Sequence, residues 1–429
     1  MKDQKRPTHS SKKAFFFLRH NNDIDHITPV LYKWLSTENI PTDVIITSNR
    51  KFLKDYRIEY LKKYKNVRIF YINDLFKKYN LAYIFNIIYA KYTTQLDDFF
   101  KKNPIAKKIA NKIIRNIANE IFKGTDKGIV VFDWTFTYFV QQVVEISKKR
   151  NFITISLPHG DAPYVNHLIT NNALNYKYKD IYASIKIFDY IVVPNHLCYK
   201  RYDNYIEKNR IKLLGSPRYC DEWMNIILNM TPTFNVANSK EKLKIVLFLR
   251  NTGYPIFWEE VVRTIKLILQ FPNTYLIVKH HPRNSTAKSL TKKLITLYPE
   301  LKKDIDVNLK FIYNGTNSVS LLKWADLIID VGTSVTWDAI KQGKPVLMPE
   351  YLHANYSTVA YYIKTSEIKC RDEFYDILQK FVQNKNLKFY NENERKKFIK
   401  EIIDVPDKYV LERYVDFLKG CLNECEGEI

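Results

Sequence analysis

The sequence predicts an α/β protein built from two parallel-sheet units. Short apolar runs of strand length alternate with amphipathic runs of helix length along most of the 429 residues. The alternation breaks at residues 226–241, which shift to Thr, Asn, Pro and Ser, and it then restarts. The length also suits two or three domains, at about 100–200 residues each. Two such units joined by one linker are expected to face a central cleft.

The first half supplies strand candidates that are apolar and rich in β-branched or aromatic residues. They are AFFFLR (14–19), TDVIITSN (42–49), VRIFYI (67–72), GIVVFDW (128–134), FITISLP (152–158), DYIVVPN (189–195) and IKLLGSPR (211–218). Helices are expected at 24–38, 137–150 and through the long segment 76–123.

The second half repeats the pattern. Its strand candidates are LKIVLFLR (243–250), TYLIVKHH (274–281), LKFIYN (309–314), ADLIIDVG (325–332) and KPVLMPE (344–350), with a helix at 257–271. We therefore expect an N-terminal domain at 1–225, a linker at 226–241, a C-terminal domain at 242–405 and a closing helix at 406–429.

Composition excludes several classes of protein. Apolar residues make up 46% and charged residues 26%, which argues against a disordered or collagen-like chain. No run of 18 apolar residues occurs, and the basic, polar start is not typical of a secretory signal. The five cysteines show no CxxC or CxxH spacing, so we expect a reduced, cytoplasmic protein without bound metal.

The net charge of +23 can be solvated surface, or it can attract a polyanion. Basic residues are densest in 101–123, where isoleucines recur every four positions. Such a helix either packs on its own domain with a wet basic face, the interpretation we favour, or lies on the anionic inner leaflet of a membrane.

Ligands of open α/β sheets bind at the carboxyl ends of the strands, so residues that directly follow strands are the site candidates. The strongest is ADLIIDVGTSVTWDAIKQGKPVLMPE (325–350). A helix start with Gly332, Thr333 and Ser334 offers N–H and hydroxyl donors to a phosphate. Asp338 lies on the same helix face, and Glu350 suits a ribose or sugar hydroxyl. The alternative is a pair of ordinary helix caps.

Positive charge gathers after two other strands of this half. VKHHPRN (278–284) places Lys279, His281 and Arg283 at a strand end, which suits a diphosphate, although a solvated basic turn would look the same. FLRNTGY (248–254) places Arg250 at the end of another strand.

The first half offers groups for proton transfer and for an acceptor. In SLPHGDAPY (156–164), His159 follows a strand, and Asp161 can orient it or bind an acceptor hydroxyl. The structural alternative is a satisfied histidine. Further acceptor-side candidates are Asp23 and His26, in RHNNDIDH (19–26), and Arg218, in GSPR. The motifs GxGxxG, GxxxxGK[ST], HExxH and GxSxG are absent.

The order of these segments resembles the GT-B glycosyltransferases, and more narrowly the group of CDP-glycerol glycerophosphotransferases and capsule polysaccharide transferases. The segments that carry the resemblance are PHGDAP, GSPR, FLRN, KHHPR and ADLIIDVGTSVTWDAIKQGKP. The resemblance implies two Rossmann-like parallel-sheet domains around a central cleft, with the acceptor on the N-terminal domain and the nucleotide donor on the C-terminal one.

The resemblance also implies a reaction. We expect a metal-independent transferase of the cell envelope that needs no cofactor. It would move a sugar or polyol phosphate from a nucleotide-sugar or CDP-polyol donor to a glycan or lipid-linked acceptor, with inversion. His159 would be the general base, and the cations of the C-terminal domain would stabilise the leaving nucleotide.

Two alternatives stay open. UDP-GlcNAc 2-epimerases have the same architecture, and their C-domain loop is similar to GTSVTWDAIKQGKP. A basic nucleic-acid-binding protein would use the net charge, but no recognition module or basic stripe with interleaved aromatics is found, so nucleic acid is not an expected partner.

Overall fold

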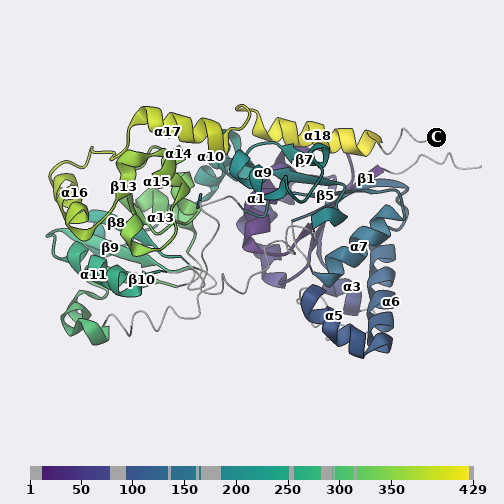
Figure 1. Cartoon of the computed structure of the whole chain (residues 1–429), viewed down its shortest axis with the longest axis horizontal. Coiled ribbons are helices and arrows are strands. Elements are labelled where there is room, and N and C mark those ends of the chain that lie inside the picture. The colour runs from purple at the N-terminus through teal and green to yellow at the C-terminus, as the bar shows by residue number, and fades with distance from the viewer. Residues whose placement is uncertain are drawn as a thin grey trace, which may run out of the picture. The chain divides into compact units, whose positions relative to one another are not determined.

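The computed structural model describes residues 12–77, 93–133, 137–160, 164–165, 185–250, 256–281, 292, 295–313 and 316–424 (Figure 1). The chain forms two compact units. The first comprises 1–161, 177–220 and 404–429, and the second comprises 162–176 and 221–403. Each unit contains one sheet whose paired strands all run parallel, which confirms the predicted fold class.

The first sheet has the order β3-β2-β1-β4-β5-β6-β7. Its strands are β1 (Lys12–Leu18), β2 (Thr42–Ile46), β3 (Val67–Tyr71), β4 (Lys127–Phe132), β5 (Ile153–Ser156), β6 (Tyr190–Val193) and β7 (Ile211–Leu213). The inner strand β1 reads KKAFFFL, the apolar run expected where helices cover both faces of a sheet, and its last five residues are buried. Register fixes Phe16 beside Val44 on one side and Val131 on the other.

Except for α18, which follows the second unit in the chain, the helices of the first unit connect successive strands of its sheet as crossovers. They are α1 (Asn21–Thr37), α2 (Tyr56–Leu61), α3 (Asn73–Lys77), α5 (Thr93–Lys102), α6 (Pro104–Ile121), α7 (Tyr138–Lys148), α9 (His196–Tyr202) and α18 (Val410–Glu424). Among the described residues, no helix has both the length and the apolar character that crossing a lipid bilayer requires.

The second sheet has the order β10-β9-β8-β11-β12-β13. Its strands are β8 (Leu243–Phe248), β9 (Thr274–Lys279), β10 (Leu309–Ile312), β11 (Leu327–Asp330), β12 (Val346–Pro349) and β13 (Glu367–Ile368). Helices α10 (Asp221–Met230), α11 (Trp258–Leu269), α13 (Ser318–Trp324), α14 (Val335–Lys341), α15 (Thr358–Tyr362), α16 (Arg371–Gln383) and α17 (Glu392–Phe398) belong to this unit.

The unit boundaries differ from the expected ones in two places. The boundary expected at 225/226 falls inside α10, because the stripe of Trp223, Met224 and Ile227 is buried and continues the helix. The closing helix α18 packs on the first unit rather than standing apart. The Arg413 guanidinium donates to the Leu214 carbonyl at 3.0 Å, and the Tyr414 hydroxyl donates to the Gly215 carbonyl at 2.9 Å.

Gly215 makes this docking possible. Its φ is +90°, and a Cβ there would lie 2.6 Å from the Val405 carbonyl oxygen. A side chain would therefore push the returning segment away. The predicted loop GSPR thus has a packing function at its glycine, in addition to any role of its arginine.

Candidate functional site

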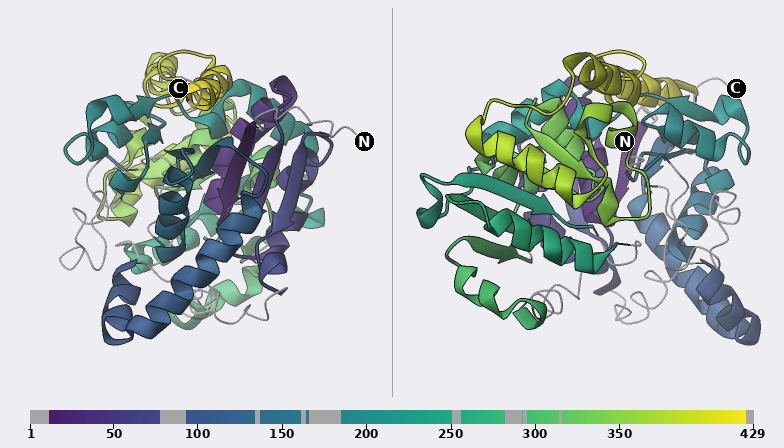
Figure 2. Two further views of the ribbon diagram at one scale, coloured as in Figure 1. Left: turned by 90° about the vertical axis from the view of Figure 1, so that its right-hand side faces the viewer. Right: turned by 60° about the vertical axis from the view of Figure 1, so that its left-hand side comes forward.

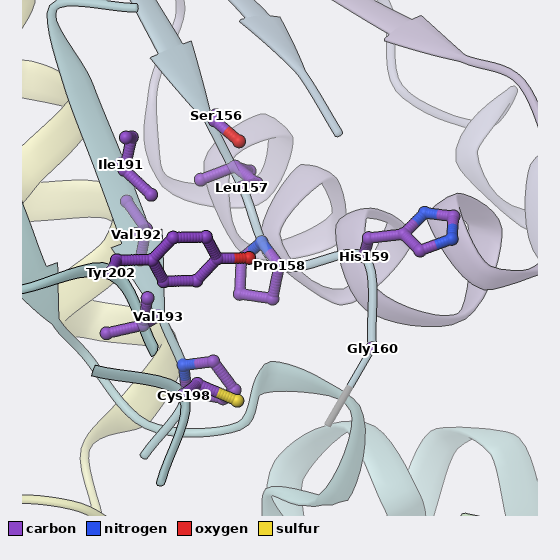
Figure 3. A pocket seen from close by; sticks show the side chains of 11 residues that line it. Ser156, Leu157, Pro158, His159, Gly160, Ile191, Val192, Val193, Cys198 and Tyr202 are labelled. Atoms are coloured by element: carbon purple, nitrogen blue, oxygen red, sulfur yellow. The ribbon is translucent and has the colours of Figure 1, made fainter. Parts of the chain in front are cut away.

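His159 lies three residues beyond β5, at the carboxyl edge of the first sheet. The Leu157 N–H donates to the Phe132 carbonyl at 2.7 Å, so the strand pairing continues almost to the histidine. Figure 3 shows the His159 ring directed toward the purple α1 helix, away from Tyr202 and Cys198. Those two residues line a cavity of about 30 Å³ together with the ends of β5 and β6 and with His159 itself. The polar chemistry of His159 therefore lies on its α1 side.

Two buried carboxylates hold the His159 ring. Its Nδ1 lies 3.0 Å from Asp23 Oδ1 and 2.8 Å from Asp133 Oδ2, and both aspartates are at most 3% exposed. Asp133 directly follows β4, and Asp23 lies in the first turn of α1. The Arg19 guanidinium, 3.6 Å from Asp133 Oδ2, adds positive charge. The ends of the adjacent strands β1, β4 and β5 thus supply one polar cluster.

Asp23 is positioned by the start of its own helix. Its Oδ2 accepts the N–H groups of Arg19 at 2.6 Å and His20 at 2.9 Å, and its Oδ1 faces His159. Because both aspartates face Nδ1, the proton of a neutral ring belongs on Nδ1, and Nε2 carries the free lone pair. The Asn22 amide nitrogen lies 3.4 Å from Nε2. Nε2 is therefore the atom available for proton transfer.

The cluster shifts the pKa values of its members. Burial raises the pKa of Asp23 to about 6, helped by the charge of Asp133. For His159, burial opposes the charged ring, but hydrogen bonds to Asp133 and Asp23 outweigh it and raise the pKa to about 9. The imidazolium is therefore the main form at neutral pH, and its proton is held tightly.

We expect the His159 ring to titrate near pH 9 in the folded protein rather than near its ordinary value of 6.5. The stability that this imidazolium contributes is then complete below about pH 6.5 and is lost as the pH rises through about 9. NMR of imidazole-labelled protein measures the titration. In Asp133→Asn the pKa should fall, because one of the two carboxylate hydrogen bonds is lost. A wild-type ring that titrates below 6.5 would contradict the described cluster.

The same groups could also hold a cation. His20, Asp23, Asp133 and His159 each offer one ligand atom, and these atoms lie within 4.8 Å of one another. Two imidazoles and two carboxylates form a donor set that suits a tetrahedral divalent ion. In the described arrangement, however, His159 Nδ1 and the Arg19 guanidinium already face the carboxylates, and their charges balance.

The expected acceptor-side residues separate in the structure. Asp23 belongs to the His159 cluster. His26 is 2% exposed and packs on the Tyr219 ring, and burial lowers its pKa to about 3, so it is a neutral core histidine without a surface for an acceptor. Arg218 lies 3.3 Å from Asp25, which also pairs with Arg57. Asp161, expected beside His159, lies outside the described residues.

In the second unit, Lys279 ends β9 and is 4% exposed. Its ammonium donates to the His280 carbonyl at 3.1 Å, and burial lowers the pKa of Lys279 to about 8. His280 is buried and stacks on Tyr313, with ring centroids 5.1 Å apart and planes at 13°. His281 is half-buried, and Arg283 lies outside the described residues. The expected cation at this strand end is therefore present at Lys279.

The turn after β11 is stabilised by its own carboxylate. Asp330 accepts the Thr333 N–H at 2.6 Å and the Thr333 hydroxyl at 2.5 Å, and it also accepts the Thr336 hydroxyl. Burial raises the pKa of Asp330 to about 6 despite these bonds. The two donors that Thr333 was expected to offer a phosphate are thus directed at Asp330, and the helix that follows, α14, has only 7 residues. Phosphate binding at Ser334 stays a prediction.

Tyr164 is the residue that sequence reasoning missed. It is fully buried, pairs with Ser357 as an antiparallel bridge, and donates from its hydroxyl to the Val331 carbonyl at 3.4 Å. Gly332 has a φ of +70°, and a Cβ there would lie 2.4 Å from the Tyr164 ring. The open side of Gly332, where we expected a phosphate, is thus filled by tyrosine.

Arg250 joins the same arrangement. Its guanidinium donates to the Gly332 carbonyl at 2.7 Å and lies 5.0 Å from the centre of the Tyr164 ring. Arg250, Gly332 and Tyr164 therefore contact one another within the second unit. An aromatic residue shortly after the histidine-glycine pair was the sequence signal, but nothing in its local pattern places it beside Gly332.

The two expected acidic residues of this unit differ in their surroundings. Asp338 is buried in the first turn of α14. Glu350 follows β12 as expected, and its carboxylate accepts the Ser357 N–H at 2.9 Å and the Ser357 hydroxyl at 2.5 Å. Glu350 thus holds the loop that also pairs with Tyr164, and a contact with a sugar or ribose hydroxyl remains a prediction.

Comparison with known proteins rests on the fold. No family model and no curated protein sequence matches the chain. Among solved structures, UDP-GlcNAc 2-epimerase from Neisseria meningitidis bound to UDP-GlcNAc aligns with a TM-score of 0.56 and 11% identity, covering 96% of this chain and 100% of that one. A glycosyltransferase from Rickettsia africae aligns with a TM-score of 0.55 and 12% identity, covering 98% of this chain and 100% of that one.

Anabaena HepE, solved in complex with UDP and glucose, aligns at 0.55 and 11% identity, covering 95% of this chain and 99% of that one. Several of these neighbours are UDP-GlcNAc 2-epimerases, and at 10–15% identity they show the fold alone. The narrower resemblance to CDP-glycerol transferases finds no support among them. With sheets of seven and six parallel strands, this chain has the GT-B fold that UDP-GlcNAc 2-epimerases share with glycosyltransferases.

Proposed function

We propose that this chain is an enzyme that converts a nucleotide sugar and breaks the bond between the anomeric carbon and the nucleotide diphosphate. The observation that carries the proposal is the His159 ring held by Asp23 and Asp133 at the carboxyl edge of the first sheet. A histidine whose Nδ1 faces carboxylates, so that Nε2 is the nitrogen that gains or loses a proton, is the usual arrangement for proton transfer. The fold supports the substrate class, since similar structures hold UDP-GlcNAc or UDP.

The cluster stabilises the product of proton uptake. When neutral His159 accepts a proton on Nε2, the imidazolium forms between two carboxylates that already face Nδ1. Asp23 and Asp133 therefore act as Asp does in a Ser-His-Asp triad, since they orient the ring and balance its charge. With a pKa of about 9, the neutral His159 ring is a strong base. At pH 7, however, the ring is neutral in only about one protein molecule in a hundred.

The second unit supplies cations for the phosphates. Lys279 is the last residue of β9, and Arg250 lies two residues beyond the neighbouring strand β8. Each is fixed by a hydrogen bond to a backbone carbonyl. Fixed cations stabilise the negative charge that develops on a departing diphosphate, and they do so without reorganising. We assign the donor phosphates to these two residues, with His281 and Arg283 as the further candidates from the sequence.

Two reactions fit this arrangement. In a glycosyl transfer, an acceptor hydroxyl loses its proton to His159 Nε2, its oxygen bonds to the anomeric carbon, and the C–O bond pair leaves with the diphosphate. The carboxylate-stabilised imidazolium favours this reaction, with a glycan or lipid-linked acceptor. In a 2-epimerisation, the C2–H bond of the sugar must break and re-form on the opposite face, and the epimerase structures among the neighbours favour that reaction.

An assay without acceptor separates the two. Purified protein is incubated with UDP-GlcNAc in D₂O and followed by NMR. A 2-epimerase is expected to incorporate deuterium at C2 and to form the C2 epimer or free UDP. A transferase is expected to leave the donor unchanged until an acceptor is added, while UDP-GlcNAc still raises the melting temperature.

The Lys279→Met variant tests the assignment of the donor phosphates and should show no shift of the melting temperature with nucleotide. The matched control is Lys244→Met, on β8, which should retain that shift. If no nucleotide sugar, CDP-polyol or free nucleotide shifts the melting temperature of the wild type, the proposed substrate class is wrong. Activity that disappears on chelation of divalent ions and returns with them would assign the His159 cluster to a metal instead.

A further inference from the structure

The end of the α5–α6 pair exposes apolar side chains that the rest of the first unit does not cover. Phe99 is 48% exposed, Ile105 is 75% exposed and Ile109 is 51% exposed. We call residues 99–112 the α5–α6 tip. Both views of Figure 2 show the blue α5–α6 pair extending away from the strands of the first sheet.

The exposure results from one helix stripe that runs beyond its support. Isoleucines repeat at every fourth position of α6, so they share one face. Ile113, Ile117 and Ile121 are buried against the unit. Ile109 and Ile105, which lie about one and two helical turns before Ile113, are exposed. The sequence alone favoured a helix packed on its own domain with a wet basic face. In the structure the buried residues of α6 begin at Ala110, and the isoleucines of its first turns are exposed.

The tip is held in place from behind. Phe100 and Leu96 of α5 are buried, and the Phe100 ring contacts the Tyr138 ring of α7 at 4.9 Å. The Tyr138 hydroxyl donates to Asn111 of α6. The exposed side chains therefore belong to an anchored pair of helices, and the apolar face is presented in a fixed shape.

Positive charge surrounds this apolar face. Residues 99–119 contain no Asp or Glu, and the exposed basic side chains there are Lys101, Lys102, Lys107, Lys108, Lys112 and Arg115. Apolar side chains at the centre of a lysine-rich surface are typical of segments that insert into the interface of an anionic bilayer. The stems of the lysines add apolar contact while their ammonium groups reach the lipid phosphates.

We propose that the α5–α6 tip docks the protein on an anionic lipid surface, with Ile105, Ile109 and Phe99 entering the headgroup region. A second copy of the chain does not suit this face, because it would bring two strongly basic surfaces together. The exposed apolar part is also only three side chains, well below the roughly 800 Å² per partner of a stable protein interface. This proposal does not depend on the proposed function.

Co-sedimentation of the full chain with vesicles tests the proposal. Phosphatidylcholine vesicles are compared with an equimolar mixture of phosphatidylcholine and phosphatidylglycerol. Wild type is expected to bind the mixture and to lose that binding at high salt. The Lys107→Gln/Lys108→Gln variant should bind about ten- to thirtyfold more weakly, since each cation near the surface contributes about a fivefold factor. The Ile105→Gln/Ile109→Gln variant should bind at least about tenfold more weakly.

The matched controls lie in the second unit. Lys302→Gln/Lys303→Gln removes two exposed lysines, and Val307→Gln removes an apolar side chain that is 50% exposed. Both should bind vesicles like the wild type. Equal binding to neutral and mixed vesicles, or equal losses in the controls, would overturn the proposal. So would a dimer in sedimentation velocity that the isoleucine variant abolishes, or vesicle binding that depends on the lysines but not on the isoleucines.

Discussion

Replacing His159 by glutamine is expected to lower kcat by about 10²–10⁴-fold, the usual contribution of a general acid–base residue. Glutamine keeps hydrogen-bonding capacity beside Asp23 and Asp133 but cannot carry a proton between substrate and protein. The melting temperature should fall at neutral pH, because the stabilising imidazolium is lost. Its shift by nucleotide should be retained, because the cations assigned to the phosphates belong to the second unit. Steady-state kinetics and a thermal-shift titration measure the two properties separately.

The pH dependence identifies the direction of proton transfer. If neutral His159 is the base, kcat/KM should rise with pH until about 9, the pKa of the free enzyme's ring. If the imidazolium is the acid, kcat/KM should instead fall through the same pH. Asp133→Asn should shift the inflection downward, while Asp25→Asn, which alters the neighbouring Arg218 pair, should leave it in place. A His159→Gln variant with activity within a few-fold of wild type would remove the histidine from the mechanism.

The second large effect is expected for Gly332→Ala, which should destabilise the second unit by about 2–5 kcal/mol. Alanine at a φ of +70° is strained, and its Cβ would lie 2.4 Å from the Tyr164 ring. The ring is buried between Arg250 and the β-bridge partner Ser357, so it has little room to move. Hydrogen exchange of the β8 and β11 amides measures the stability of this unit by itself.

Gly343→Ala is the matched control. Gly343 has a φ of +71°, but the nearest atom to an added Cβ there is the Tyr390 hydroxyl oxygen, at 3.7 Å. It should cost only the backbone strain, about 1–2 kcal/mol. In the double variant Tyr164→Ala/Gly332→Ala, the added cost of the alanine at 332 should approach that of Gly343→Ala. Equal losses in the two single glycine variants would show that Tyr164 does not restrict position 332.

The parts of the fold that depend on local pattern could be predicted from the sequence. AFFFL and IVVF are continuous apolar runs because both faces of a parallel strand are covered, and they became β1 and β4. The position of His159 after a strand could be predicted for the same reason. Its partner Asp133 could not, because the order of strands in the sheet brings β4 between β1 and β5. Strand order is a tertiary property, and no spacing in the sequence reports it.

Contacts between segments far apart in the sequence could not be predicted from the local pattern either. Tyr164 is a single aromatic residue outside any periodic run, and its burial depends on residues near 250, 332 and 357. The docking of α18 depends on Gly215, about two hundred residues earlier. The amphipathic pattern shows that such a helix needs an apolar surface, but it does not show which unit provides it.

The return of α18 to the first unit has a consequence for how the protein is made. The ribosome releases the chain from its N-terminus, and domains usually fold in that order as they emerge. Here the sheet that positions His159 is synthesised before 221–403, but its covering helix α18 follows that segment. The second unit can therefore complete its core first, while the first unit waits with the Gly215 surface uncovered. A nascent chain of this protein therefore exposes that surface while 221–403 is being synthesised.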